Sequence, residues 1–141
     1  MSSGPSPIAV VEAFNRAWIR GDIDDAMRVV APDCVYALYI SDELLTHGGE
    51  TRGRDNIRAA LTEVRIDFEY VLYRPYNVVL DGDVCRYRVE FMYRHRRSGE
   101  MLNGNLRFLM QVRDGLIVRA DEYHDRAMVE AFLRLFNAPQ A

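Results

Sequence analysis

Residues 114–125 read DGLIVRADEYHD, and this stretch decides the fold. It opens on Asp114-Gly115, a dipeptide that favours the tight turn of a β-hairpin between apolar runs. The segment after the turn predicts a strand, in which successive side chains point to opposite faces. Four residues are therefore expected on one face: Val118, Ala120, Glu122 and His124. Because Val118 and Ala120 are apolar, Glu122 is a carboxylate on an otherwise apolar face, and its position needs a reason.

The composition is that of an ordinary globular protein. The 141 residues are 49% hydrophobic and 28% charged, which suits one folded domain. The net charge of −3 gives no general attraction to nucleic acid, and no apolar run reaches membrane-spanning length. Cys34 and Cys85 lack a metal-type spacing, so we expect them to be reduced and buried in a cytoplasmic protein. We expect a disordered N-terminus at 1–7, a single domain at 8–137 and a tail at 138–141.

Apolar residues at helical spacing predict three helices before the long strands. They are expected over 6–20, 22–31 and 54–64, with a short fourth helix over 126–136. Gly21 ends the first helix and Asp22 caps the second, which carries Val30 as its last apolar position and stops at Pro32. Residues 41–53 are polar and contain glycine, and they predict a loop that holds His47.

The remaining segments predict strands joined by tight turns. They are expected over 34–40, 68–80, 84–96, 101–113 and after Asp114-Gly115. Consecutive strands with tight turns predict an antiparallel sheet, and helices collected at the N-terminal end indicate an α+β fold. We therefore expect a curved antiparallel sheet whose apolar face and three N-terminal helices enclose a cone-shaped pocket.

Three pieces of the sequence together resemble the nuclear transport factor 2-like superfamily, especially its SnoaL-like polyketide cyclase branch. They are AFNRAWIRGDIDDAMRVVAPDCVY at 13–36, TRGRDNIRAAL at 51–61 and VRDGLIVRADEYHD at 112–125. The resemblance runs from Ile8 to Phe136 in order and at comparable spacings. It implies the cone-shaped, ketosteroid isomerase-like fold but no single reaction, because this fold carries enzymes, binding modules and assembly partners alike.

Two chemistries of the superfamily lack their residues here. Steroid isomerases of this fold use a Tyr and two Asp side chains, and the matching positions hold Phe14, Leu38 and Phe108. Limonene-epoxide hydrolases use an Arg and an Asp on a middle strand, where this chain has Phe91 and Tyr93. Only their acid on the last strand is matched, by Glu122.

The resemblance to SnoaL-like cyclases implies a simpler active site than those two, in which one pocket carboxylate removes a proton next to a carbonyl group. Glu122 fits that role as the candidate general base, and His95 and His124 have the strand parity to assist it. Glu122 could equally be a structural tie to an Arg or to backbone groups. The expected pocket residues are Phe14, Trp18, Tyr36, Leu38, Phe91, Tyr93, Phe108, Met110 and Ala120. No metal-type spacing and no cofactor motif is found, so we expect no cofactor.

Two functions remain open. The first is a cofactor-independent cyclase, isomerase or hydrolase that acts on an apolar, carbonyl-bearing molecule. The second is a non-catalytic protein that binds a small apolar molecule or supports another protein as a dimer. Arginines of the outer sheet face alternate with Glu90, and the resemblance implies that this face forms a homodimer: Arg86, Arg88, Arg94, Arg96, Arg97 and Arg107. No nucleic-acid or membrane partner is expected.

Overall fold

The computed structural model describes residues 5–40, 43–44, 49–124, 127, 130–131 and 134–135. It contains the helices α1 (Pro7–Arg20), α2 (Ile23–Met27) and α3 (Arg54–Asp67). The Ser6 side chain accepts a hydrogen bond from the Ala9 amide, and Pro7 is the first residue of α1, so these two residues are ordered parts of the helix. Gly21 ends α1 with a φ of 78°, as predicted. The helix predicted over 126–136 lies largely outside the described residues.

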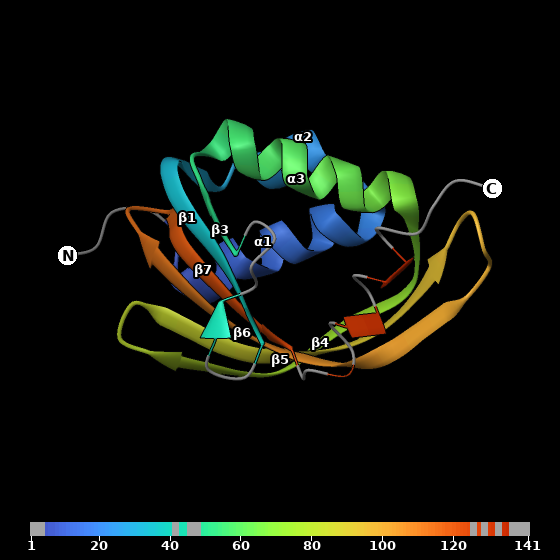
Figure 1. Cartoon of the computed structure of the whole chain (residues 1–141). Helices are drawn as coiled ribbons and strands as arrows, with labels where there is room; N and C mark the ends of the chain where they lie inside the picture. The colour runs from blue at the N-terminus through green and yellow to red at the C-terminus, as the bar shows by residue number, and fades with distance from the viewer. Residues whose placement is uncertain are drawn as a thin grey trace.

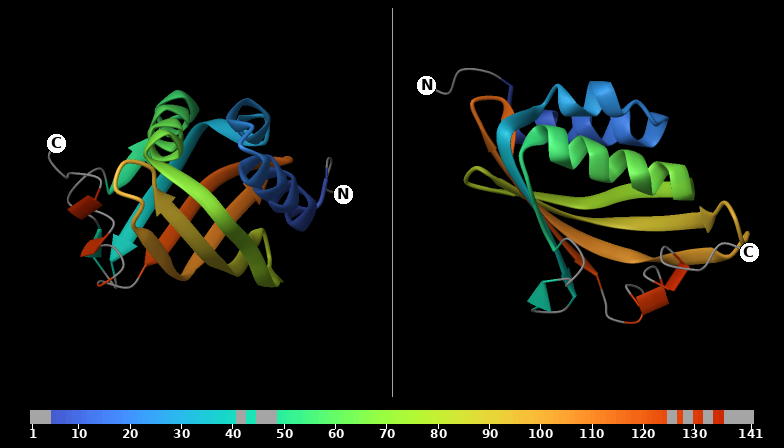
Figure 2. Two further views of the ribbon diagram at one scale, coloured as in Figure 1. Left: turned by 90° about the vertical axis from the view of Figure 1, so that its right-hand side faces the viewer. Right: turned by 45° about the horizontal axis from the view of Figure 1, so that its top comes forward.

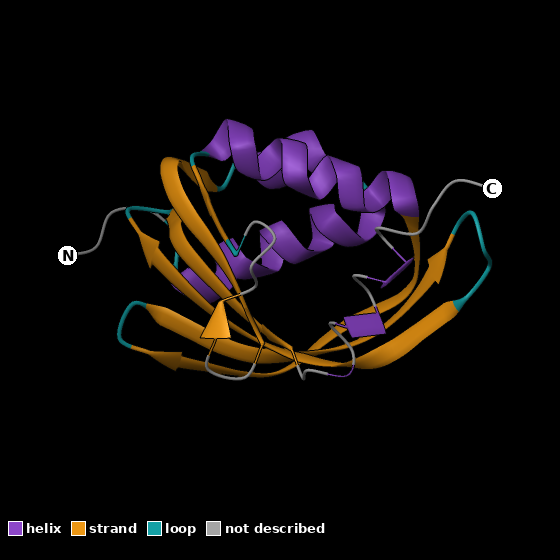
Figure 3. Ribbon diagram, viewed as in Figure 1, coloured by secondary structure: helices purple, strands orange, loops and turns teal. Residues whose placement is uncertain are grey.

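Within the described residues, seven strands form one sheet (Figures 1 and 3). They are β1 (Val30–Ile40), β2 (Glu43–Leu44), β3 (Glu50–Arg52), β4 (Phe68–Asp81), β5 (Val84–His95), β6 (Met101–Arg113) and β7 (Leu116–His124). Their order is β2-β1-β7-β6-β5-β4, and β3 also pairs with β1. The four long strands from β4 to β7 are antiparallel neighbours, and Asp114 and Gly115 form the last turn with positive φ angles of 51° and 77°.

The prediction of a purely antiparallel sheet is wrong for one pair. β1 and β7 are parallel, with Leu38 level with Glu122. The chain leaves β1, crosses through α3 to β4 at the far edge and returns by three hairpins, so the last strand arrives beside β1 in the same direction. This pairing joins segments far apart in the sequence, and no local turn signal announces it.

Two predicted boundaries also differ. The second helix is only five residues long, and Val30 and Pro32 belong to β1 rather than to the end of that helix. The β1–β7 register shifts between Val30 and Val35, and such an irregularity is where a strand tolerates proline. The predicted polar loop over 41–53 contains β2 and β3, both paired with β1. His47 lies outside the described residues.

The helices lie over the concave face of the curved sheet (Figure 2). Six core residues of α1, α3 and the long strands are at most 5% exposed: Phe14, Trp18, Ile57, Phe91, Phe108 and Met110. Leu61 is only partly buried against them. Phe91 is buried and Arg88 is exposed, so the predicted inner and outer faces of β5 are confirmed. Cys34 and Cys85 are buried and unpaired, as expected. In the described part of the chain, no helix is long and apolar enough to cross a membrane.

Candidate functional site

Glu122 lies on β7 between two strands, level with Leu38 of β1 and Phe108 of β6. Its side chain is 15% exposed, and both carboxylate oxygens are engaged. The Tyr36 hydroxyl donates to Oε1, and Nε2 of His124 lies against Oε2. The structure therefore brings together three of the predicted site residues, Glu122, Tyr36 and His124, at the junction of β1 and β7.

The strand parity around Glu122 holds for Ala120 but is interrupted before it. The β6–β7 register shifts between Gln111 and Val112, and Ile117 stands level with Val112. Ile117 is 1% exposed, whereas Val118, expected on the same face as Glu122, is only partly buried. A β-bulge of this kind adds one residue to a strand; Val118 is that extra residue, so the parity count that started at Glu122 misassigns it.

Five tyrosines surround the negative charge of Glu122. Burial raises the pKa of each hydroxyl above its ordinary value, and the charge of Glu122 raises it further: Tyr36, Tyr70, Tyr73, Tyr87 and Tyr93. All five therefore stay protonated at neutral pH and remain hydrogen-bond donors. Glu122 thus faces an interior with a shell of hydroxyl groups rather than a purely apolar one.

Tyr70 and Tyr73 belong to this shell although simple alternation would separate them. They are three residues apart on β4, and parity alone puts such residues on opposite faces. The β4–β5 register shifts between Tyr70 and Leu72, so that Tyr70 stands level with Tyr93 and Tyr73 with Phe91. The rings of Tyr70 and Tyr93 stack with centroids 4.1 Å apart. The only signal in the sequence was the aromatic richness of this strand.

His95 is not brought to Glu122. It is 3% exposed and lies at the end of β5 that leads into the β5–β6 hairpin, where its Nδ1 is 2.8 Å from the Ser98 hydroxyl and accepts from the Ser98 amide. Its ring packs on Phe68 at 5.1 Å. His124 instead contacts Phe91, edge to face, at 6.0 Å. His95 therefore stabilises a turn, and the histidine available to Glu122 is His124.

A small apolar pocket lies beside Tyr36; its volume is only about 10 Å³, so side chains fill most of the space. Four predicted pocket residues line it: Phe14, Tyr36, Met110 and Ala120. Its other lining residues are Val30, Cys34, Ile57 and Ile117. The other five predicted pocket residues do not line this space: Trp18, Leu38, Phe91, Tyr93 and Phe108. Phe91 and Tyr93 instead stack on each other at 4.4 Å within the tyrosine-rich interior.

Two interior polar residues had no signal in the sequence. Asn15 of α1 is 6% exposed, and its Oδ1 accepts from the Tyr87 hydroxyl at 3.5 Å. Arg65 of α3 places its guanidinium against the rings of both Trp18 and Tyr70. Within the described residues, no three His, Cys, Asp or Glu side chains gather in a way that could hold a metal ion.

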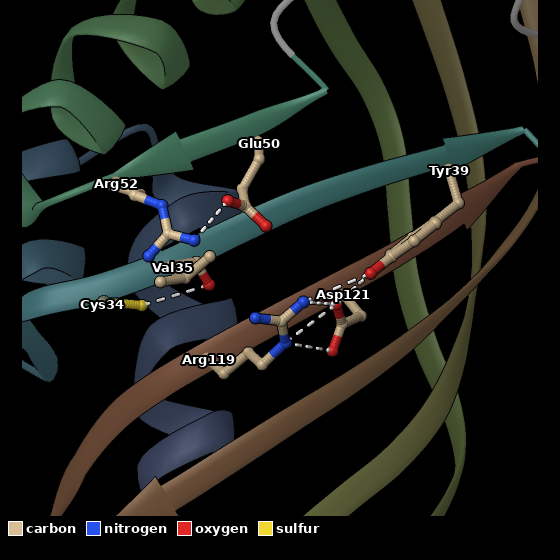
Figure 4. A network of polar contacts seen from close by, with 7 residues as sticks. All are labelled: Cys34, Val35, Tyr39, Glu50, Arg52, Arg119 and Asp121. Carbon is tan, nitrogen blue, oxygen red and sulfur yellow. Dashed lines mark hydrogen bonds and ion pairs between the residues drawn. The ribbon is translucent and has the colours of Figure 1, made fainter. Parts of the chain in front are cut away.

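The outer face of the β1–β7 pair carries a separate polar network (Figure 4). The Tyr39 hydroxyl donates to Asp121 at 3.0 Å, and Nε of Arg119 donates to both oxygens of Asp121 at 3.2 and 3.1 Å. The Tyr39 ring stacks on Tyr123 with centroids 4.5 Å apart, and the Arg107 guanidinium lies 5.1 Å from the Tyr123 ring. This face therefore presents ordered aromatic and charged side chains on the side of the sheet opposite α1.

Comparison with known proteins gives one family. The model of the SnoaL-like domain matches residues 11–120. No curated protein matches the sequence significantly. Solved structures match over most of the chain at low identity, and such matches show the fold alone.

Three of these solved structures show how differently the proteins with this fold are described. An NTF2-like protein of Burkholderia xenovorans LB400 has a TM-score of 0.75 at 20% identity, covering 93% of this chain and 98% of that one. A Catenulispora acidiphila protein with a ketosteroid isomerase-like fold, solved in complex with trimethylamine, has a TM-score of 0.74 at 17% sequence identity. The match covers 90% of this chain and 92% of that one. A Xanthomonas campestris protein of unknown function with a cystatin-like fold has a TM-score of 0.78 at 19% sequence identity. The match covers 91% of this chain and 98% of that one.

Proposed function

The chain belongs to the family of SnoaL-like domains, and on that premise we propose that it is a small-molecule pocket protein with Glu122 as a cofactor-independent general base. The observation that carries the proposal is the carboxylate of Glu122, held in the interior by Tyr36 and His124 and surrounded by protonated tyrosines. Its substrate would be an apolar molecule with a carbonyl group. Cyclase- and isomerase-type reactions on such a molecule can share one first step, whereas a hydrolase-type reaction would use the same base to take a proton from water.

In that step, a carboxylate oxygen of Glu122 takes a proton from the carbon next to the carbonyl. The electron pair of the broken C–H bond moves into an enolate, whose negative charge settles on the carbonyl oxygen. Protonated hydroxyls with raised pKa values, such as those of Tyr70, Tyr73 and Tyr93, are suited to donate to that oxygen. The proton then returns from Glu122 to the substrate at the same or another atom.

Tyr36 and His124 would act as positioning residues. Tyr36 donates to Oε1 and keeps the carboxylate from rotating, while His124 holds Oε2. Each carboxylate oxygen has a second lone pair, so Glu122 can accept a substrate proton while these contacts remain. A base must be oriented in this way before proton transfer becomes efficient.

The experiment measures proton abstraction without knowing the substrate. The protein is incubated in D₂O with a small panel of apolar ketones, such as 2-tetralone and 2-indanone, and deuterium incorporation next to the carbonyl is followed by NMR. We expect exchange above the buffer rate, with loss of about 10²–10⁴-fold in Glu122→Gln, the range typical of a removed general base. The matched control is Glu90→Gln, which changes an outer-face carboxylate paired with Arg74 and should leave exchange intact.

The alternative is a non-catalytic pocket protein. It is favoured by the two donors that already occupy Glu122, an arrangement that also suits a structural tie between β1 and β7. On that alternative no ketone exchanges, Glu122→Gln lowers the melting temperature, and binding of any apolar ligand is unchanged. Equal exchange rates in the wild type and in Glu122→Gln would remove the catalytic proposal.

We also propose a homodimer through the outer face of the sheet and a cytoplasmic location. The dimer is supported by the ordered network of Tyr39, Asp121 and Arg119 and by the stacked Tyr123. Two buried, unpaired cysteines support a reducing compartment. Sedimentation at micromolar concentration should give twice the monomer mass, and Tyr123→Arg should shift it to monomer. A monomer at all accessible concentrations would contradict the dimer.

A further inference from the structure

Arg65 lies in the last turn of α3, with its side chain directed into the tyrosine-rich interior. Its Cζ atom is 4.5 Å from the centroid of the Trp18 ring and 4.2 Å from that of the Tyr70 ring. The two rings meet edge to face at 5.1 Å, so they form an aromatic corner around the guanidinium. Contact with an aromatic face attracts the cation but provides no hydrogen-bond acceptor of carboxylate strength.

Two nitrogens of this guanidinium are buried without a hydrogen-bond partner among the described residues, Nε and Nη2. No carboxylate in the described part of the chain forms an ion pair with Arg65. The neighbouring charge is also positive, since Nε of Arg96 donates to the Arg65 carbonyl at 3.3 Å. Burial lowers the pKa of Arg65, as expected for a cation without a counter-ion. Buried polar groups are normally satisfied, so this one needs an explanation.

The two unpartnered atoms are a matched pair. Nε and Nη2 carry parallel N–H bonds along one edge of the guanidinium, and this edge fits the two oxygens of a carboxylate. An isolated point charge would accept any anion, whereas this edge selects a planar group with two oxygens. Arg65 is partly exposed as a residue, whereas its Nε and Nη2 atoms are buried, so a ligand must displace neighbouring side chains to reach this edge.

The same interior connects Arg65 with Glu122. The charges of Arg65 and Glu122 both act on the pKa values of Tyr70 and Tyr73. The negative charge of Glu122 raises these pKa values, and the positive charge of Arg65 lowers them. These two tyrosines therefore lie within the electrostatic reach of both groups. Arg65 and Glu122 therefore act on the same pair of tyrosines.

We propose that Arg65 is a substrate-binding residue whose Nε–Nη2 edge pairs with a carboxylate, so that the ligand is an apolar or aromatic small-molecule carboxylate. The inference rests on the proposed function for the placement of the reacting carbonyl carbon near Glu122. The carboxylate subsite itself depends only on Arg65, Trp18 and Tyr70. The ligand is then held at one end by its charge, and its apolar body packs on the aromatic corner.

The experiment uses Trp18 as the reporter, because it is the only tryptophan in the sequence and lies against Arg65. Phenylacetate and its neutral amide, phenylacetamide, are titrated against the full chain, with Trp18 fluorescence and NMR as readouts. We expect phenylacetate to bind at least about 10-fold more tightly than the amide, and Arg65→Gln to weaken phenylacetate about 10- to 100-fold without weakening the amide.

Two variants separate charge from geometry. Arg65→Lys keeps the positive charge but loses the planar edge, so it should recover only part of the preference for the acid. Arg88→Gln removes an exposed arginine of the outer face and should change nothing. Should Arg65→Gln fail to fold, the affinities of the wild type and of Arg65→Lys for phenylacetate and phenylacetamide still test the carboxylate subsite.

The outcomes distinguish this inference from the proposed chemistry. Glu122→Gln should still bind phenylacetate more tightly than the amide, although it loses proton abstraction. The same preference is expected if the protein has no catalytic activity. Equal binding of acid and amide by the wild type, binding of neither, or an unchanged preference in Arg65→Gln would each overturn the carboxylate subsite. In those cases the guanidinium only fills the aromatic corner.

Discussion

The Tyr36 hydroxyl donates a hydrogen bond to the Oε1 atom of Glu122, and this bond joins two strands that are 86 residues apart in the chain. Tyr36 stands level with Ala120, one inward position before Glu122, because β1 and β7 are parallel and in register. In an antiparallel pair the two side chains would approach from opposite directions along the strands. The parallel pairing thus determines which hydroxyl the carboxylate meets.

Removing this hydroxyl tests its energetic role. Tyr36→Phe leaves an interior carboxylate with one fewer donor, and hydrogen bonds to charged groups contribute about 1.5–3 kcal/mol. We expect the free energy of unfolding, measured by urea denaturation, to fall by roughly that amount. The control is Tyr76→Phe, because the Tyr76 hydroxyl donates to Asn105 at 2.6 Å on the exposed surface. A loss no larger than that of the control would show that the Tyr36 contact adds little.

The tyrosine shell predicts alkaline unfolding. The folded-state pKa values of Tyr36, Tyr70, Tyr73, Tyr87 and Tyr93 lie above the ordinary value of 10.0. A group with a raised folded pKa contributes stability that is fully present below the unfolded pKa and is lost as pH rises through the folded one. Stability should therefore begin to fall near pH 10.0 and continue to fall above it.

Tyrosinate absorbance and far-ultraviolet circular dichroism, recorded together during an alkaline titration, check this prediction. The sequence has eight tyrosines, of which these five form the shell. We expect the five to ionise in one step that coincides with the loss of secondary structure. Gradual ionisation of all eight in a chain that stays folded would contradict the buried shell.

The cysteines should be unreactive in the folded protein. Burial raises the pKa of the Cys34 thiol to about 12 and also raises that of Cys85. The thiolate is the reactive form, so at about pH 8 only about one Cys34 in ten thousand is ionised. We expect no reaction with a disulfide reagent on the time scale of minutes and reaction of both thiols in denaturant. Rapid labelling of the native protein would indicate that the interior opens more readily than the packing suggests.

Arg65→Met gives a stability test that is independent of any ligand. Methionine keeps an apolar chain in the aromatic corner and removes two unpartnered donors, whose burial costs free energy. The lost cation–π contact is worth about 2 kcal/mol at a desolvated site, which is no more than the burial of two unpartnered donors costs. We therefore expect a melting temperature equal to or above that of the wild type. A clear decrease in melting temperature, with Arg88→Met as the control, would indicate that the guanidinium is there for stability.

Local pattern was sufficient for much of the fold. The alternation along β5 placed Phe91 inside and Arg88 outside because side-chain direction in a strand depends only on position. The Asp114-Gly115 turn followed from the positive φ angles that those residue types tolerate. Gly21 marked the end of α1 for the same reason.

The sequence by itself identified Glu122, Tyr36 and His124 as polar residues of the interior, whereas only the tertiary structure decided which of them meet and placed Asn15 and Arg65 in the same interior. Glu122 was identified as an acid on an apolar face, but its contact with Tyr36 depends on the parallel β1–β7 pairing, which no local signal encodes. His95 has the right parity yet lies at the β5–β6 hairpin, because parity fixes the face of a strand and not the position along it. The β-bulge after Tyr70 and the aromatic corner around Arg65 likewise arise from packing between distant segments.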